Sequence, residues 1–326
     1  MAVNKIKSFK GNHCETTTTG TLLLQLGIQL SEPMLFGLGE ALGFIFWNMK
    51  TMDFPFIGGR IKPDLLTKNL ARNLNLELIV KETSSRDKAW SEVKDLIDKG
   101  NTVGLKLDCY YLEYFSKPFH FAGHYAALYG YNDKDAFLVD TLQQGTQVKT
   151  SLQSLALARS AKGPMASKSL FYTLNNRNGK TDLRKAVVTA IRNNASDYLN
   201  PPITNIGYKG ILKTSKEIIK WFDNSKNVEH EFATVAMLME KAGTGGALFR
   251  NLYRDFLNES FTLLDNTRLR SAHKSFSEIA VQWTEISKLF EKVSTSKDRQ
   301  YILDASKILK EISVKEKEVM EGLVLL

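Results

Sequence analysis

The segment that most constrains the fold is residues 11–26, which read Gly-Asn-His-Cys-Glu-Thr-Thr-Thr-Thr-Gly-Thr-Leu-Leu-Leu-Gln-Leu. Gly11 and Asn12 favour a turn, and the leucines that follow favour the apolar face of a helix. We therefore expect Cys14 at or beside the first residue of a buried helix. Free backbone N–H groups and the positive end of the helix dipole gather there, and they stabilise a thiolate.

The four threonines, Thr16 to Thr19, fit the first turn of this helix better than its interior. We expect their hydroxyls to satisfy free backbone N–H groups. A single cysteine beside an apolar helix is most often a small core residue. A catalytic role for Cys14 requires a histidine and a carboxylate or amide further along the chain.

Downstream of this helix the pattern alternates between short strands and helices. We predict a short helix after Ser31, a strand over 44–47, a loop over 54–59 and a helix over 63–73. The remaining elements are expected to be strands over 76–81, 102–107 and 169–174, and helices over 85–99 and 151–161. This mixture indicates an α+β or α/β fold.

A β-hairpin is predicted over 123–140, where two apolar runs flank an Asn-Asp turn. His124 begins its first strand and Asp140 follows the second, so both lie at the end opposite the turn. A three-residue loop, 132–134, places the two side chains on one face within reach of each other. A four-residue loop without a bulge would put them on opposite faces.

An aromatic segment, 108–115, follows one of the predicted strands. Tyr110 and Tyr111 are candidates for lining a substrate pocket, and a packed aromatic corner is an equal alternative. We expect Cys109, at the end of an apolar strand, to be a buried structural thiol.

The composition changes around 175–179, and the remaining sequence is helical almost throughout. We predict one domain over 1–175 and a helical domain over 176–326. Apolar side chains recur there at spacings of three and four, as in helices that pack into a core.

The composition excludes several classes of protein. There are only 2 cysteines, no zinc-type spacing, no secretory signal and no apolar run long enough to span a membrane. We therefore expect a cytoplasmic protein without a bound metal. The net charge of +9 is spread over both halves and no nucleic-acid-binding motif accompanies it, so an acidic protein partner is favoured.

Taken together, these motifs resemble the butirosin-type acyltransferases, a family with a papain-like fold and the order Cys, His, then Asn or Asp. The N-terminal matches are His13-Cys14, Leu30-Ser31-Glu32, Phe36-Gly37-Leu38-Gly39, Tyr110-Tyr111-Leu112, Gly123-His124, Gly130-Tyr131-Asn132-Asp133 and Val139-Asp140. Residues 243–253 are similar to the helical domain that commonly follows. Some relatives resemble the amide-forming enzymes of closthioamide-type pathways.

The resemblance implies transfer of an acyl group from a carrier-protein thioester to a small amine or diamine. Cys14 would be the nucleophile, His124 the base and then the acid, and Asp140 the orienting carboxylate. No cofactor is implied beyond the phosphopantetheine of an acyl or peptidyl carrier protein. Papain-like peptidases have a Gln six residues before the cysteine, where this chain has Ser8. The oxyanion donors would therefore include the Cys14 backbone with Asn12 or His13.

A diamine acceptor carries a cationic end that needs a carboxylate or aromatic faces. Glu15 and Glu113 are the candidates, with Glu15 alternatively a first-turn helix residue and Glu113 a solvated charge. Two other classes stay open, a papain-like peptidase or amidase and a non-catalytic scaffold. The sequence also leaves open whether the chain forms a homo-oligomer.

Overall fold

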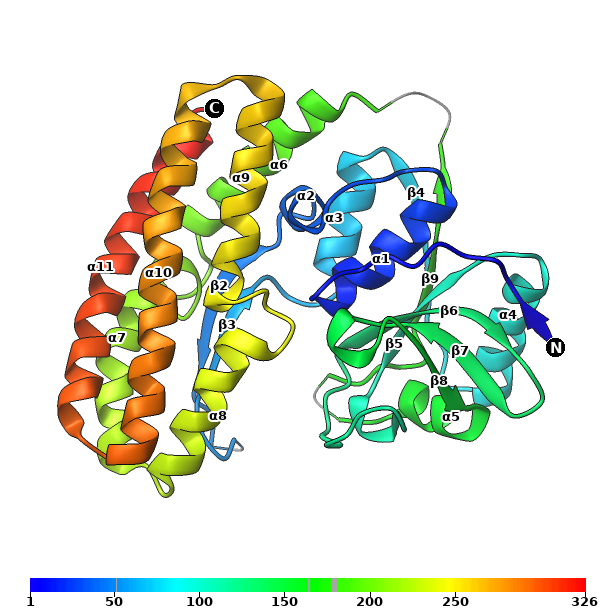
Figure 1. Cartoon of the computed structure of the whole chain (residues 1–326), viewed down its shortest axis with the longest axis horizontal. Helices are drawn as coiled ribbons and strands as arrows, with labels where there is room; N and C mark the ends of the chain where they lie inside the picture. Colours follow the sequence, from blue (N-terminus) through cyan, green and yellow to red (C-terminus); the bar gives the residue numbers. More distant parts are fainter. Residues whose placement is uncertain (51, 164, 178–180) are drawn as a thin grey trace. The chain divides into compact units, whose positions relative to one another are not determined.

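The computed structural model describes residues 1–326 except 51, 164 and 178–180. The chain forms two compact units (Figure 1). Unit 1 comprises residues 1–35 and 66–181, and unit 2 comprises residues 36–65 and 182–326. This division differs from the boundary expected after residue 175, because residues 36–65 belong with the helical unit.

Unit 1 is built on an antiparallel sheet in the order β4-β9-β5-β6-β7-β8, with β1 pairing to β6. Its strands are β1 (Ala2–Val3), β4 (Leu76–Lys81), β5 (Val103–Leu107), β6 (His124–Tyr131), β7 (Asp135–Val139), β8 (Gln147–Ser151) and β9 (Phe171–Asn176). The central strands, β5 and β6, are buried on both faces, which matches their nearly continuous apolar sequence.

Helices cover both faces of the sheet. They are α1 (Cys14–Gln25), α3 (Leu65–Asn73), α4 (Arg86–Asp98) and α5 (Leu152–Ser160), with short 3-10 turns η1 (Cys109–Tyr111) and η2 (Leu142–Gln144). Helices α4 and α5 share one core with Leu105, Leu128 and Phe171. Helix α1 lies on the opposite face. Tyr172 follows Phe171 in β9, so its side chain points to that other face, where its hydroxyl hydrogen-bonds Thr19.

Four chain segments converge at one end of this sheet. Strand β5 ends there, β6 begins there and β7 ends there, because the strands are antiparallel. The loop before α1 joins them, since the backbone N–H of Leu142 donates to the carbonyl of Gly11 over 2.9 Å. The folding of the sheet thus brings the start of α1 to the end that carries His124 and Asp140.

The β6–β7 hairpin reaches this geometry through a bulge. Tyr131 pairs with Ala136 near the turn, so the expected three-residue loop is wrong. The register then shifts between Leu128 and Gly130, and Ala127 pairs with Val139, which is the pairing that a three-residue loop without a bulge would have produced. A four-residue loop alone would have placed Asp140 on the face opposite His124. The bulge returns it to the same face.

Unit 2 combines a two-stranded sheet with a bundle of helices. Its elements are β2 (Leu42–Trp47), β3 (Phe56–Arg60), α6 (Leu183–Leu199), α7 (Gly207–Asn224), α8 (Val228–Lys241), η3 (Ala247–Phe249), α9 (Arg250–Leu264), α10 (Thr267–Ser296) and α11 (Arg299–Val324). A further helix, α2 (Glu32–Leu38), begins in unit 1 and ends in unit 2. The bundle core holds a fully buried ion pair, in which Arg250 Nε lies 2.8 Å from Glu316 Oε1.

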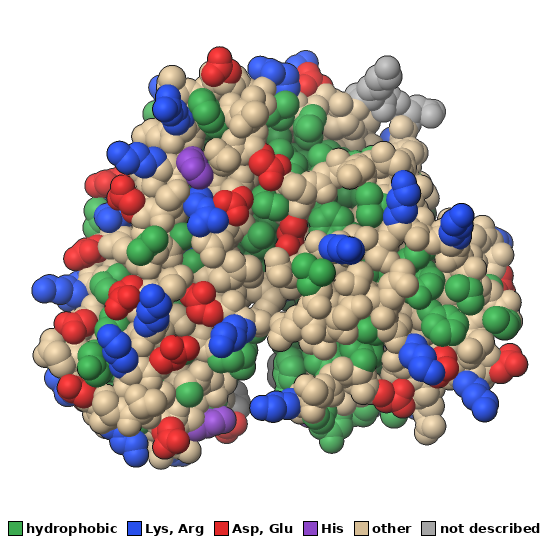
Figure 2. All heavy atoms as spheres, viewed as in Figure 1, with side chains coloured by type: hydrophobic (Ala, Val, Ile, Leu, Met, Phe, Trp, Pro, Cys, Tyr) green, Lys and Arg blue, Asp and Glu red, His purple; other side chains and the backbone are tan. Residues whose placement is uncertain are grey.

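The α+β class and the helical C-terminal part are confirmed, whereas the loop expected over 54–59 is wrong. Strand β3 covers most of it. The backbone of Leu248 approaches Gly59 of this strand so closely that a Cβ there would lie 2.3 Å from the Leu248 carbonyl oxygen. Among the described residues, no helix combines the length and apolarity that a membrane span needs. On the face in Figure 2, lysine and arginine side chains are interspersed with aspartate and glutamate.

Candidate active site

The two side chains predicted to act together at the end of the hairpin are in contact. His124 Nε2 lies 2.7 Å from Asp140 Oδ2, and both residues are buried. Because Nε2 is engaged by the carboxylate, Nδ1 is the imidazole nitrogen that remains for other partners, and the Cys109 thiol is one of them. This is the arrangement of a histidine whose ring is oriented by an acid.

Two further donors fix the Asp140 carboxylate. The Tyr114 hydroxyl donates to Oδ2 over 2.7 Å, and the Thr141 backbone N–H donates to Oδ1 over 2.6 Å. The neighbouring Phe115 ring packs edge-on against the His124 imidazole, with centroids 5.3 Å apart and planes at 90°. Tyr114 was not predicted as a site residue, because the conformation of the loop after η1, which brings its hydroxyl to Asp140, has no signal in the sequence.

The charge of Asp140 controls the protonation of His124. Burial alone would lower the pKa of His124, but the Asp140 carboxylate, with a further contribution from Cys109, raises it well above its ordinary value. The protonated imidazolium is therefore favoured at neutral pH. An imidazolium is the partner that stabilises a nearby thiolate.

Cys14 is the first residue of α1, directly after its N-cap, His13, and its side chain is 9% exposed. The expected position at the helix start is confirmed. A buried carboxylate anchors the loop that delivers it: Glu32, at the start of α2, accepts the backbone N–H groups of Asn12 and His13 over 2.9 and 2.8 Å. The Thr16 hydroxyl also lies within hydrogen-bond distance of Glu32, at 2.8 Å.

This anchor changes the expected roles of the loop. The N–H groups of Asn12 and His13, proposed above as oxyanion donors, are directed to Glu32 instead, as is the Asn12 side-chain amide. The Thr17 hydroxyl donates to the His13 carbonyl, and the Thr16 hydroxyl has its one proton directed to Glu32 or to that carbonyl, so the expectation that they cap free N–H groups is wrong for both. The burial of Glu32 was not predicted, since acids in a first helical turn are usually solvated.

The second thiol belongs to the same site. Cys109 lies just beyond β5, whose last residue, Leu107, pairs with His124. It is 1% exposed, and burial raises the pKa of its thiol, although the charge of His124 and a hydrogen bond to it partly offset this. A negative charge on Cys14 would raise the pKa of Cys109 further. Cys109 is buried as expected, but it is a neighbour of the histidine as well as a core residue.

The four predicted substrate-binding residues do not converge. Glu15 is fully buried and accepts the N–H and hydroxyl of Thr67. Glu113 accepts the N–H and hydroxyl of Ser151 at the start of α5, which lowers its pKa. Tyr110 is exposed and stacks on His120, and Tyr111 lies edge-on to Tyr110.

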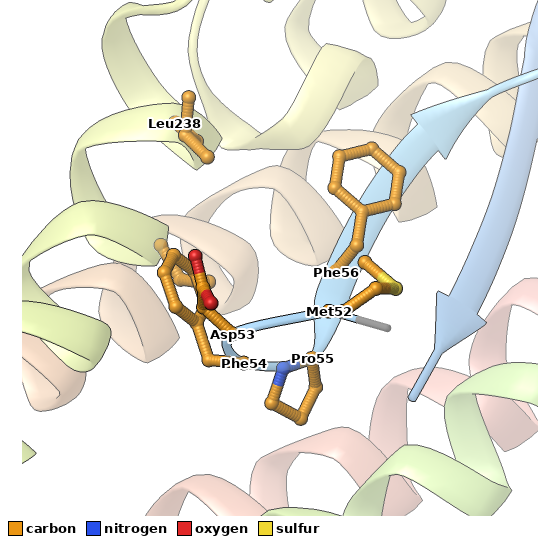
Figure 3. Close-up of a pocket in the computed structure, with 7 residues that line it drawn as sticks. Met52, Asp53, Phe54, Pro55, Phe56 and Leu238 are labelled. Carbon is orange, nitrogen blue, oxygen red and sulfur yellow. The ribbon is translucent and has the colours of Figure 1, made fainter. Parts of the chain in front are cut away.

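A pocket of about 320 Å³ lies in unit 2 and is lined by Met52, Asp53, Phe54, Pro55, Phe56, Val235 and Leu238 (Figure 3). None of the predicted site residues lines it. Among the described residues that line it, Asp53 alone is ionisable, so they offer no acid–base pair. In the described part of the chain, no three His, Cys, Asp or Glu side chains group as metal ligands.

Two protein-family models match the sequence. The model described as butirosin biosynthesis protein H, N-terminal, matches residues 13–141, which include Cys14, Cys109, His124 and Asp140. The model described as a domain of unknown function, DUF4872, matches residues 153–323. No curated protein matches the sequence.

Proposed function

Because the chain belongs to the butirosin biosynthesis protein H type of family, with a DUF4872 C-terminal region, we propose that it is a biosynthetic acyltransferase that forms amides. The acyl group comes from the thioester of a carrier protein, passes through an acyl-enzyme on Cys14, and is accepted by a small amine. The observation that carries the proposal is the oriented pair of His124 and Asp140, 2.7 Å apart, beside the helix start that bears Cys14. The unit that holds them would be papain-like in fold.

Acylation needs a thiolate, the form of a cysteine that attacks a carbonyl. Cys14 stands where a helix places its positive end, and an imidazolium on His124 adds a cation. The Cys14 sulfur attacks the thioester carbonyl, and the bond between that carbon and the pantetheine sulfur breaks. His124 gives its proton to the departing thiolate. One thioester replaces another, so the step has a small thermodynamic cost.

Amide formation reverses the direction of the proton. The amine nitrogen attacks the acyl carbon on Cys14, the carbon–sulfur bond breaks, and His124 takes the amine proton as Cys14 leaves as a thiolate. Asp140 stabilises the imidazolium that results. Because Cys14 begins α1, its backbone N–H has no intrahelical carbonyl partner and is the donor we assign to the oxyanion.

Cys14 is favoured over Cys109 as the nucleophile for two reasons. It lies at a helix N-terminus, and it is more exposed than Cys109, which is 1% exposed. Burial also raises the pKa of Cys109 and disfavours its thiolate. Cys109 then serves as the buried neighbour that packs against His124.

Turnover with an acyl carrier protein thioester and a small diamine tests the function. Mass spectrometry of the small-molecule products should find the amide, in amounts that depend on the amine. Free acid formed at the same rate with or without amine would identify a hydrolase instead. No release of the acyl group would indicate a protein without this activity.

A further inference from the structure

The loop between β5 and β6, which we call the aromatic loop, covers residues 109–121. It holds seven aromatic side chains, namely Tyr110, Tyr111, Tyr114, Phe115, Phe119, His120 and Phe121. The proposed reaction uses only Tyr114 and Phe115, through their contacts with the Asp140 carboxylate and the His124 ring.

A buried acid closes the base of this loop. Asp108, 2% exposed, accepts the backbone N–H of Tyr110 over 3.1 Å and that of Phe121 over 2.9 Å. Its other oxygen lies 3.0 Å from His120 Nδ1. The backbone N–H of Cys109 also donates to the Phe121 carbonyl, over 3.2 Å. Both ends of the loop are therefore held at one point, as in a compact Ω-type loop.

An aromatic surface runs outward from the catalytic histidine along this loop. The ring of Phe115 touches His124, Phe119 follows at 6.1 Å between centroids, and Phe121 lies 6.4 Å from Phe119. Phe119 is 51% exposed, although burying a phenylalanine side chain is favourable. Met165, which is 40% exposed, lies near Phe121: a Cβ added at Gly123 would be 3.1 Å from the Phe121 ring and 3.4 Å from the Met165 methyl group. A row of neighbouring aromatic rings thus leads from His124 to the exposed Phe119.

We propose that this surface, formed by Phe115, Phe119 and Phe121, binds the acyl group of the substrate and selects one with a flat, aromatic end. The inference rests on the proposed function, because it names the acyl class for the Cys14 thioester. Aromatic rings pair with one another in edge-on and offset geometries, which the spaced rings of this loop offer to a further ring.

The charges in the loop favour the acyl group over the amine as occupant. Its only acid, Glu113, is engaged by Ser151 and Thr150, and Asp108 is engaged at its base. Lys117 adds a positive charge to the same loop. A cationic amine would therefore meet no available carboxylate there. The pantetheine arm is a chain of amides and carries no ring to pair with the surface.

The test uses unreactive ligands, so that binding is measured apart from catalysis. Two ketone analogues of small pantetheine thioesters, with CH₂ in place of the thioester sulfur, differ only in a phenyl or a methyl acyl end. Their dissociation constants are measured by calorimetry for the wild type, for Phe119→Ala, and for Phe56→Ala as a matched exposed phenylalanine.

We expect the wild type and Phe56→Ala to bind the phenyl ketone more tightly than the methyl ketone. Phe119→Ala should weaken the phenyl ketone about tenfold, equivalent to about 1.4 kcal/mol, and leave the methyl ketone unchanged. Equal binding of the two ketones by the wild type, or an equal effect of Phe119→Ala on both, would overturn the inference. If the phenyl preference holds but the corresponding thioester acylates no cysteine, the proposed function fails while the acyl-binding surface stands.

Discussion

His124 Nε2 and Asp140 Oδ2 lie 2.7 Å apart, and the contact depends on a bulge in the β6–β7 hairpin that links them. A hairpin with an even loop and no bulge would have directed the two side chains to opposite faces of the sheet. The proposed catalytic role of His124 therefore depends on this bulge, and bulges are common near active sites.

The first prediction concerns the protonation of His124. Asp140→Asn removes the carboxylate that raises the His124 pKa, so the pKa should fall. The imidazolium would then be lost at a lower pH, and acylation should decline at a lower pH than in the wild type. Histidine titration by NMR checks the direction. A His124 pKa that stays unchanged in Asp140→Asn would contradict the electrostatic account.

Asp140→Asn should also slow acylation less than His124→Ala does. An amide can still accept a hydrogen bond from Nε2 and orient the ring, whereas His124→Ala removes the proton donor and acceptor and should cost orders of magnitude. Single-turnover rates with one thioester compare the two variants.

Tyr114→Phe tests the hydroxyl that donates to Asp140. Without this donor the carboxylate keeps more negative charge for the imidazolium, so the His124 pKa should rise. The acylation rate should fall roughly threefold to tenfold, because a charge-assisted hydrogen bond that orients Asp140 is lost. Tyr129→Phe, on the same sheet, is the control. Identical pH profiles for Tyr114→Phe and the wild type would show that the hydroxyl is not part of the site.

Glu32→Ala tests the anchor of the Cys14 loop. The variant leaves the N–H groups of Asn12 and His13 without their acceptor, and we expect a loss of about 3 kcal/mol in the free energy of unfolding. Glu113→Ala, which removes an exposed carboxylate, should cost clearly less. Urea denaturation followed by circular dichroism measures both. Equal stability losses in the two variants would argue against the buried anchor.

Much of this fold was predictable because its signals are local. The alternation of short strands and helices, the Asn-Asp hairpin and the leucine run after Cys14 each depend on neighbouring residues, and each forms the expected type of element. The meeting of His124 with Asp140 was predictable only as far as their shared end of the hairpin, because the bulge that brings them to one face has no local signal in the sequence. Strand β3 was missed because its two glycines suggest a loop, whereas Gly59 lies where the backbone of Leu248 approaches closely and Gly58 lies against the side chains of Ile45 and Phe56.

The contacts that the sequence could not predict join distant segments. Glu32 meets Asn12, and Tyr114 meets Asp140, through the paths of loops whose conformations no periodicity encodes. The same holds for the approach of Cys109 to His124, which depends on how the chain turns after β5. The assignment of residues 36–65 to the helical unit likewise depends on packing over a long sequence separation.

The most direct test of the central claim locates the acyl group on the protein. The wild type, Cys14→Ala and Cys109→Ala are each treated with an acyl carrier protein thioester without amine, digested at low pH and mapped by mass spectrometry. We predict an acyl adduct on Cys14 in the wild type and in Cys109→Ala, and none in Cys14→Ala. An adduct on Cys109, with Cys109→Ala inactive and Cys14→Ala active, would show that the buried thiol beside His124 is the nucleophile and that our assignment is wrong.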